Sequence, residues 1–458
     1  MSTPAAGGLT ATPSLPALLR RPWFLWPLAL RVLVWLVLGH SYEMAVFQDA
    51  SWQMVAGQGV YGRFAPWLAS AGDGYYAAPP LYALMLWLSG AIAAVFGSHW
   101  WLHQLLIKSW LLLADLAVMA YLLRRSPEAA RGYWTLWFVP VVAIGQVQPD
   151  LWAGLGVLAA FHLASRGQWM GAGAALGAAA AIKPVPLVIL PFLTVYLVRT
   201  DKTRVLVPLG FGVLAALAAG WLPYLLLFSD AGRIADVIRF HAERPVAGLT
   251  IPSGLLTLAN AALAVAELAG AALPRAAAAY EAAVRASAAF PAVTLGVFVF
   301  LLGLAISGRP WSVSQTFSLP LLAFLAANKV VHEHYLLLAL PLLLATGANL
   351  RGAAIAFSVY LLAAGSPLRY LPSQYGVPAG PEAWLPPPAG VITSLGLAVA
   401  AGGAALGFGV HILRLFLLTR DEAAVPRPSG ALPPRPGRQA GGGPTAPAGP
   451  GERSAPSR

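Results

Sequence analysis

Most of the side chains that could do chemistry in this 458-residue chain gather in five short stretches. The stretches are FQDASWQ with Asp49, VQPDLW with Asp150, IKPVP with Lys183, HAERP with Arg244, and NKVVHEHY with Lys329, His332, Glu333 and His334. An aspartate beside an apolar surface is suited to general-base work, because partial burial raises its pKa. Lysine, arginine and histidine are suited to holding an anion. One cavity could gather several of these groups around an anionic substrate.

The two aspartates each have a structural alternative. Asp49 lies among aromatic residues and could instead cap a helical turn that starts at Ser51. Asp150 precedes an apolar run and could cap its helix, face the cavity as an acceptor-binding residue or second acid, or do both. The same role as acceptor-binding residue or second acid is open to Glu333.

Lys183 lies where three prolines, at positions 184, 186 and 191, interrupt an apolar helix. Proline removes backbone hydrogen bonds and frees carbonyl groups, and such breaks are tolerated at membrane depth where they line a cavity. Lys183 is therefore a candidate anion ligand. The alternative is a lysine that reaches along the apolar surface toward water.

The late HEH motif predicts a turn that presents donors to an anion. His332 and His334 are two residues apart, so they would not share a face of a helix, which argues against a paired zinc site. The alternative is a cluster of surface charges. Elsewhere, Lys108 and Asp115 are seven residues apart in one apolar run and are expected to form an internal polar pair.

The composition indicates the class of molecule that must position these residues. Apolar residues make up 58% of the chain and charged residues only 10%, against about 25% charged in a soluble domain. Apolar runs of spanning length recur, so the sequence predicts an all-α polytopic membrane protein. There are no cysteines, which excludes disulfides and thiol chemistry.

The basic residues account for the net charge of +12 without a nucleic-acid partner. They cluster in short loops, as the positive-inside rule requires. Arg20 and Arg21 place the start of the first span, about residues 23–39, in the cytoplasm, so Asp49 is expected outside. We expect both ends of the chain in the cytoplasm, with residues 1–20 and 421–458 disordered around a membrane domain at 21–420.

Parity of crossings sets the remaining topology. The next basic cluster, residues 124–131, should be cytoplasmic, yet two apolar runs, 79–96 and 103–123, separate it from Asp49. We expect the run at 79–96 to lie in the outer leaflet without crossing. The total is then roughly twelve spans, with outer-face juxtamembrane helices and with residues 229–290 outside. The apolar run at 251–273 is long enough to cross and is the weak point of this count.

The order of these motifs resembles the GT-C superfamily of polyprenyl-phosphate-sugar-dependent glycosyltransferases, most closely the bacterial family 87 α-mannosyltransferases. Asp49 matches the superfamily's acid in the first outer loop, and AAPPLY (residues 77–82) is similar to its YPPL entry to a juxtamembrane helix. KPVPLVILPF resembles its K-P-x-x-L-L-x-P segment, and HEHYLLLALPLL its late H-E element. The resemblance covers roughly residues 22–420. The D-x-D acid pair is absent, since Ala50 and Ser51 follow Asp49.

The resemblance implies a GT-C fold and transfer of a hexose, mannose first, at the extracytoplasmic face of the cell membrane. The donor would be a polyprenyl-phosphate sugar, and the acceptor a glycolipid, glycan or protein. Asp49 would be the general base, and the cations that hold the leaving phosphate would be Lys183, His332, His334, Lys329 and Arg244. No metal and no cofactor are implied, because no nucleotide or diphosphate leaves.

Two other classes remain open. A lipid or glycolipid transporter would carry polar groups at mid-membrane and broken helices in symmetry-related halves. A structural scaffold would have no coherent outer cavity. No P-loop, no GxGxxG and no GxSxG motif is present, so nucleotide substrates are not expected.

Overall fold

The structure is a computed structural model, and it describes residues 15–61, 79–228, 230–235, 246–270, 274–286, 289–308, 310–328, 330–363 and 389–421. The predicted phosphate ligands Arg244 and Lys329 lie outside these ranges, as do residues 1–14 and 422–458 of the two expected terminal segments.

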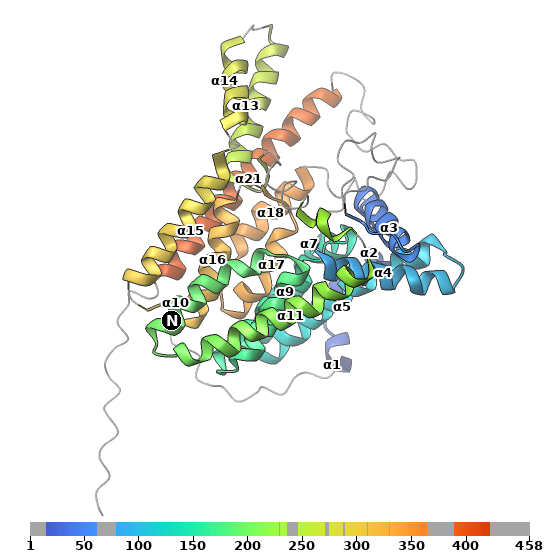
Figure 1. The fold of residues 1–458 in the computed structure, drawn as a ribbon. Coiled ribbons are helices and arrows are strands. Elements are labelled where there is room, and N and C mark those ends of the chain that lie inside the picture. The colour runs from blue at the N-terminus through green and yellow to red at the C-terminus, as the bar shows by residue number, and fades with distance from the viewer. Residues whose placement is uncertain are drawn as a thin grey trace, which may run out of the picture. The chain divides into compact units, whose positions relative to one another are not determined.

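The described part of the chain is helical apart from one pair of two-residue strands (Figure 1). The α-helices are α1 (Leu15–Leu19), α2 (Pro22–Leu36), α3 (Ser41–Val55), α4 (Pro80–Val95), α5 (Trp100–Arg125), α6 (Pro127–Trp134), α7 (Phe138–Pro140), α8 (Asp150–Ser165), α9 (Trp169–Ile182), α10 (Leu190–Arg199), α11 (Leu206–Leu227), α13 (Ile251–Leu268), α14 (Pro274–Ala286), α15 (Phe290–Ser307), α16 (Val313–Ala327), α17 (Tyr335–Ala345), α18 (Arg351–Ala363) and α21 (Ala389–Asp421). A π-helix, η2, covers Val141–Gly145, and 3-10 helices cover η3 (Val185–Ile189), η4 (Thr203–Val205) and η5 (Ala231–Arg233). Strand β1 (Ala247–Gly248) pairs in parallel with β2 (Val330–Val331).

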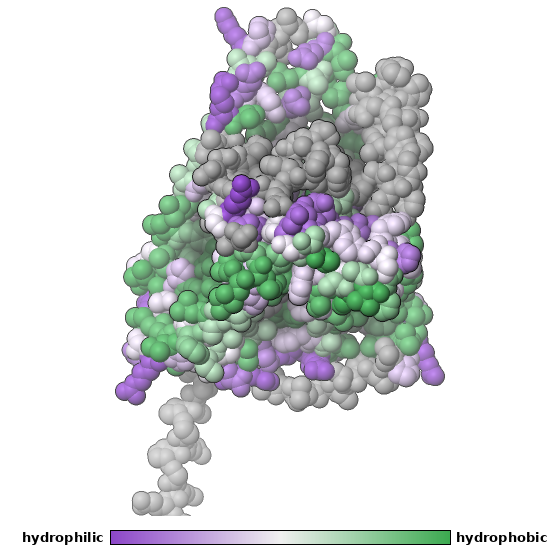
Figure 2. Space-filling model, turned by 45° about the vertical axis from the view of Figure 1, so that its right-hand side comes forward, coloured by the Kyte–Doolittle hydropathy of each residue, from purple (hydrophilic) through white to green (hydrophobic). Residues whose placement is uncertain are grey.

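Apolar side chains on the outside of the helices indicate that this surface faces lipid. On α11, Val207 is 78% exposed and Leu226 is 76% exposed, and Figure 2 shows broad apolar areas with hydrophilic residues gathered above and below them. Such surface is unfavourable in water and ordinary in a bilayer. The chain is therefore a multi-pass membrane protein.

The expectation of about twelve spans is wrong. Among the described residues five helices are long and apolar enough to cross: α5, α13, α15, the stretch Thr203–Leu227 and the stretch Ile392–Thr419. A sixth is possible if the pair 138–145 and 150–165, bent by 112°, is one span. The other apolar helices have 17 residues or fewer, and at about 1.5 Å per residue they fall short of a hydrocarbon core of about 30 Å. The run that was expected to stay outside, α13, is one of the five.

Small residues allow α9 and α11 to approach each other closely. A Cβ atom on Gly173 of α9 would lie 2.1 Å from the carbonyl oxygen of Leu209 on α11, and one on Gly212 would lie 2.2 Å from that of Met170. Glycine at both positions lets the two backbones touch, which is the usual way that helices associate in membranes.

The same device joins α8 to α17. A Cβ atom on Gly154 would lie 2.6 Å from the carbonyl oxygen of Leu337 and 2.9 Å from that of Leu338. Gly154 is about one turn after the first residue of α8, and Leu337 is the third residue of α17. The close approach therefore brings the beginnings of the two helices together.

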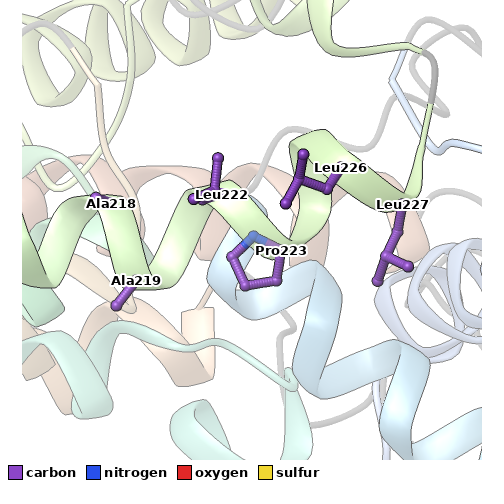
Figure 3. Close-up of a pocket in the computed structure, with 6 residues that line it drawn as sticks. All are labelled: Ala218, Ala219, Leu222, Pro223, Leu226 and Leu227. Atoms are coloured by element: carbon purple, nitrogen blue, oxygen red, sulfur yellow. The ribbon is translucent and has the colours of Figure 1, made fainter.

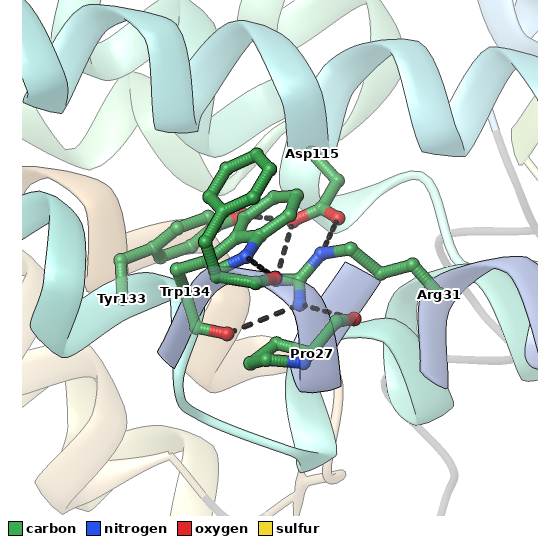
Figure 4. A network of polar contacts seen from close by, with 6 residues as sticks. Pro27, Arg31, Asp115, Tyr133 and Trp134 are labelled. Atoms are coloured by element: carbon green, nitrogen blue, oxygen red, sulfur yellow. Dashed lines mark hydrogen bonds and ion pairs between the residues drawn. The ribbon is translucent and has the colours of Figure 1, made fainter. Parts of the chain in front are cut away.

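A fully buried ion pair ties α2, α5 and α6 together (Figure 4). Nε of Arg31 donates to Oδ2 of Asp115 at 2.5 Å, and Tyr133 donates to the other oxygen at 2.6 Å. The expected Lys108–Asp115 pair is wrong, because Lys108 donates to the carbonyl oxygens of Val34 and Leu38 instead. Helical spacing places Lys108 and Asp115 on one face of α5, but both side chains bind groups of α2 or of the residues just after it.

Candidate functional site

A second buried ion pair lies where α8 begins and α9 ends. Nζ of Lys183 donates to Oδ1 of Asp150 at 2.5 Å. The Asp150 side chain is fully buried, whereas that of Lys183 is 15% exposed. The other carboxylate oxygen, Oδ2, is buried and makes no hydrogen bond with any described residue. Buried carboxylate oxygens are normally satisfied, so this oxygen can accept a hydrogen bond from one more donor.

Side chains from the start of α17 complete the cluster. Nε2 of His334 lies 4.0 Å from Oδ2 of Asp150, and the Lys183 ammonium lies 3.8 Å from the centroid of the Tyr335 ring. The rings of His332 and His334 stack with centroids 5.5 Å apart. Three of the predicted motifs, VQPD, KPVP and HEH, therefore meet in space. We call Asp150, Lys183, His332, His334 and Tyr335 the Asp150 cluster.

A sharp bend in the chain just before Asp150 directs its carboxylate toward Lys183. The π-helix η2 ends at Gly145, and α8 starts at Asp150 after a four-residue turn, so the two segments bend by 112°. Pro149 is the N-cap, and it makes no side-chain cap bond. The capping interpretation of Asp150 is therefore wrong: its side chain turns to Lys183, although an acid in the first turn still suits the helix dipole.

Lys183 follows directly on the end of α9, as the prolines predict. Its backbone is extended (φ −152°, ψ 127°) and the 3-10 helix η3 starts two residues later. The ammonium turns inward to Asp150 and the Tyr335 ring rather than outward to water. The alternative of a lysine that reaches toward the membrane surface is thus wrong.

The HEH residues lie in a turn, as expected, and not in a helix. His332 follows β2, and His334 is the N-cap of α17. β2 is held by β1, where Leu249 also donates its N–H to the carbonyl of Val331 at 2.7 Å. Glu333 lies in the same turn and is partly buried. Histidines in this turn can stack, although two residues apart on a helix they would diverge.

Asp49 lies inside α3 and not in a loop. It therefore caps no helix, so the capping alternative is wrong for this residue too. Its Oδ2 accepts a hydrogen bond from Nε2 of Gln53 at 2.5 Å. Burial raises the pKa of Asp49 above its ordinary value, and the bond from Gln53 opposes this in part. The shift has the direction that a general base requires, but no described contact joins Asp49 to the Asp150 cluster.

Sequence reasoning missed two residues beside the cluster, Glu43 and Tyr82. Tyr82 is fully buried near the start of α4, and the carboxylates of both Glu43 and Asp150 lie within electrostatic range of its hydroxyl. Glu43 is in the first turn of α3, one turn before Phe47, whose ring packs edge-on against Tyr82 at 5.4 Å. The shared face of Glu43 and Phe47 was a readable signal, whereas the position of Tyr82 depends on tertiary packing.

Tyr224 and Asp230 secure the chain that follows α3. Asp230 accepts hydrogen bonds from the Tyr61 N–H at 2.7 Å and from the Tyr224 hydroxyl at 3.0 Å, and that hydroxyl accepts from the Val60 N–H. A Cβ atom on Gly59 would collide with the Asp230 carboxylate. This anchor ties the chain that follows α3 to the end of α11 and the residues after it.

A hollow of about 450 Å³ lies along α11 (Figure 3). It is lined by Ala218, Ala219, Leu222, Pro223, Leu226 and Leu227, all apolar and all from that helix. It holds no titratable group, so it is a place for hydrocarbon rather than for chemistry. Gly220 of the same helix packs against Ala181, two residues before Lys183.

Comparison with known proteins does not assign the chain to a family. No protein-family model matches it, and no curated protein matches it significantly. A function for this protein must therefore be argued from the geometry of the Asp150 cluster.

Proposed function

We propose that the protein is a GT-C-type glycosyltransferase that moves a hexose, with mannose as the first candidate, from a polyprenyl-phosphate donor to an acceptor at the outer face of the membrane. The acceptor is a glycolipid, a glycan or a protein. The observation that carries the proposal is the position of the Lys183 ammonium between the Asp150 carboxylate and the Tyr335 ring, on a side chain that is 15% exposed. Ionisable groups in an apolar bundle are costly and are by default functional. An ammonium held in a fixed position suits a lipid-linked phosphate.

The phosphate would lie against Lys183 and His334. An ammonium has three donors, so Lys183 can keep its bond to Asp150 and still donate to a phosphate oxygen. Asp150 lies 2.5 Å from Nζ of Lys183 and 4.0 Å from Nε2 of His334, so it can orient both side chains, and it is a counter-ion for His334 when that imidazole is protonated. His332, stacked on His334, is the next donor in reach. Lys329 and Arg244 stay predictions for the same phosphate.

The apolar hollow on α11 supports a lipid carrier. Its lining residues flank Gly220, which packs against Ala181 close to Lys183. A hydrocarbon chain in the hollow would thus run beside the helix whose end carries the phosphate ligand. Neither a nucleotide nor a soluble sugar phosphate would need such a surface.

Asp49 is our general base. It would take the proton of the acceptor hydroxyl as that oxygen attacks the anomeric carbon, the glycosidic bond to the phosphate oxygen breaks, and polyprenyl phosphate leaves with the electron pair. Lys183 and His334 stabilise the charge of the leaving group, which is commonly the largest electrostatic contribution to such a transfer. Inversion at the anomeric carbon gives an α-linked product from a β-linked donor. Glu333 and Glu43 are the further acids available to bind the acceptor.

The experiment is incubation of membranes that contain the protein with radiolabelled polyprenyl-phosphate mannose or glucose, followed by identification of the labelled product. Asp49→Asn is nearly isosteric, so expression, stability and donor binding should persist while turnover falls about 10²–10⁴-fold. Glu281→Gln, on the exposed surface of α14, is the matched control. More than about a tenth of wild-type turnover in Asp49→Asn would falsify the assignment of the base.

A second function has an observation in its favour. Two interrupted helical segments, at 141–149 and at 183–189, meet at the Asp150–Lys183 pair, and broken helices around a charged site are typical of transporters. A lipid or glycolipid transporter predicts movement of the labelled lipid between leaflets without a new glycosidic bond. The same incubation separates the two, because only the transferase yields a labelled acceptor.

A further inference from the structure

Val147 has an unusual backbone conformation three residues before Asp150. Its φ is +57°, in the left-handed region that a β-branched residue rarely adopts. Its side chain is fully buried. Strained residues of this kind persist only where the surroundings hold them, and they cluster at functional sites. The question is what holds this residue.

Contacts from two neighbouring segments hold the turn. The Tyr82 hydroxyl donates to the carbonyl oxygen of Val147 at 2.6 Å, and the N–H of His40 donates to the carbonyl oxygen of Gly145 at 2.8 Å. Within the turn itself, Gln148 donates its N–H to Ala143 at 3.1 Å. Of these bonds, the one from Tyr82 is made to the strained residue.

Tyr82 is itself fixed. It is fully buried in the first turn of α4, behind the two prolines that start this helix, and the Phe47 ring packs against it. A buried tyrosine hydroxyl requires an acceptor, and Val147 supplies it. The Tyr82 hydroxyl is therefore fixed in position, and the left-handed conformation of Val147 turns its carbonyl oxygen toward that hydroxyl.

We infer that Tyr82 is a positioning residue for Asp150: its hydroxyl holds Val147 in the left-handed conformation that sets the Asp150 carboxylate opposite Lys183. Asp150 starts α8 directly after Pro149, so rotation at Val147 swings the first turn of that helix. Loss of the hydroxyl lets Val147 relax toward negative φ, and the carboxylate leaves its place between Lys183 and His334. The effect on turnover rests on the proposed function, but the effect on the turn does not.

A test that needs no activity uses the lack of cysteine in the chain. Gln148 is only 8% exposed, so Gln148→Cys in the otherwise wild-type protein should react slowly with a small thiol reagent. Adding Tyr82→Phe should speed labelling about tenfold, because one buried hydrogen bond is lost and the strained turn opens. Adding Val147→Gly to that protein should restore slow labelling, because glycine adopts positive φ without strain.

The matched control is Tyr224→Phe, which removes another buried tyrosine hydroxyl whose bonds go to Val60 and Asp230. Added to Gln148→Cys, it should leave the rate of thiol labelling unchanged. Unchanged labelling in Tyr82→Phe, or fast labelling that Val147→Gly does not slow, overturns the inference. If Tyr82→Phe does not accumulate, the double variant with Val147→Gly should accumulate and stay protected, and its failure to do so also overturns it.

Kinetics then separate positioning from general stability. If the protein transfers sugar as proposed, Tyr82→Phe should raise the apparent KM for the lipid-phosphate donor about tenfold, and Val147→Gly should reverse the change. Absence of transfer by the wild type sinks the proposed function and leaves the labelling result standing. Normal labelling in Tyr82→Phe sinks the positioning role and leaves the transferase standing.

Discussion

Two buried ion pairs among the described residues each join a basic side chain to an aspartate, but their hydrogen-bonding groups are satisfied to different extents. Around Arg31 and Asp115 the guanidinium donates to both carboxylate oxygens and to the carbonyls of Pro27 and Trp134, and it lies 3.7 Å from the centroid of the Trp134 ring. Both side chains are fully buried. In the second pair, Nζ of Lys183 donates a hydrogen bond to Oδ1 of Asp150. The Lys183 side chain is 15% exposed, and Oδ2 of Asp150 has no donor among the described residues.

The difference distinguishes a structural pair from the pair that we propose as a binding site. Charges inside an apolar bundle repay their desolvation only when their remaining hydrogen-bonding capacity is satisfied. The Arg31 pair meets that condition with protein groups alone, so it has nothing left for a ligand. In the Asp150 cluster, Oδ2 of Asp150 has no donor among the described residues, and the Lys183 side chain is 15% exposed. The proposed phosphate would bind at Lys183 and His334.

The largest expected effect follows from breaking the complete pair. Asp115→Asn keeps the shape but leaves the buried Arg31 charge without its counter-ion, which costs about 3–5 kcal/mol. We expect that loss in the free energy of unfolding, measured by denaturation in mixed micelles. Tyr133→Phe, which removes only the bond to Asp115, is the graded control and should cost about 1 kcal/mol. A loss in Asp115→Asn below about 1 kcal/mol, the value of one hydrogen bond, would mean that the pair is dispensable.

Next in size is a change in the packing that assembles the incomplete pair. Gly154→Ala puts a methyl group against backbone carbonyls of α17, so α8 and α17 must separate, at a cost of about 1–3 kcal/mol. His334 should then lose its approach to Asp150, and donor binding should weaken. Gly210→Ala, in a helix where nothing lies within 4 Å of the added group, should be neutral or slightly stabilising. Equal effects of the two substitutions would contradict the close-packing argument.

A smaller change in stability is expected when the incomplete pair is broken. Lys183→Met removes the ammonium and leaves the Asp150 carboxylate with His334, at a cost of about 1–2 kcal/mol. The loss is smaller than in Asp115→Asn because the buried Asp150 carboxylate that is left behind can take up a proton and become neutral, whereas Arg31 stays charged. Binding of polyprenyl phosphate, measured on the purified protein, should fall at least tenfold. Lys202→Met, at an exposed position on the chain after α10, is the control. Unchanged affinity in Lys183→Met would leave the pair structural.

How much of this could be predicted from the sequence differs between the two pairs. The prolines around Lys183 break the helix as expected, because proline acts locally. The partner of Lys183 is Asp150, 33 residues away, and the pair forms through the packing of α8 against α9. Likewise, Asp115 was matched with Lys108 on its own helix, since periodicity describes one helix and not its neighbours. The structure gives Asp115 to Arg31, 84 residues away.

The fold shows the same limit. Composition and apolar runs predicted a helical membrane protein, because they measure the solvent that each segment prefers. They did not give the number of spans. An apolar run in the sequence does not begin and end where a helix does, so it need not form one helix that is long enough to cross. One apolar run, for example, forms α17 (Tyr335–Ala345) with only 11 residues, nearly all buried. Such a segment is apolar because it packs inside the bundle, not because it faces lipid.

The smallest expected effect on stability concerns Asp49, which belongs to neither of the two ion pairs. Burial raises its pKa in the folded protein, so between the unfolded and folded pKa values the folded state binds more protons. The contribution of Asp49 to stability therefore falls as pH rises through that window. Compared with Asp49→Asn, the wild type should lose less than about 0.5 kcal/mol of stability between about pH 4 and pH 7. Gln53→Leu removes the hydrogen bond that lowers this pKa, so it should enlarge the loss and shift the acidic limb of the turnover profile to higher pH. A wild type whose stability relative to Asp49→Asn rises with pH would show an acid stabilised as its anion, which is a poor base.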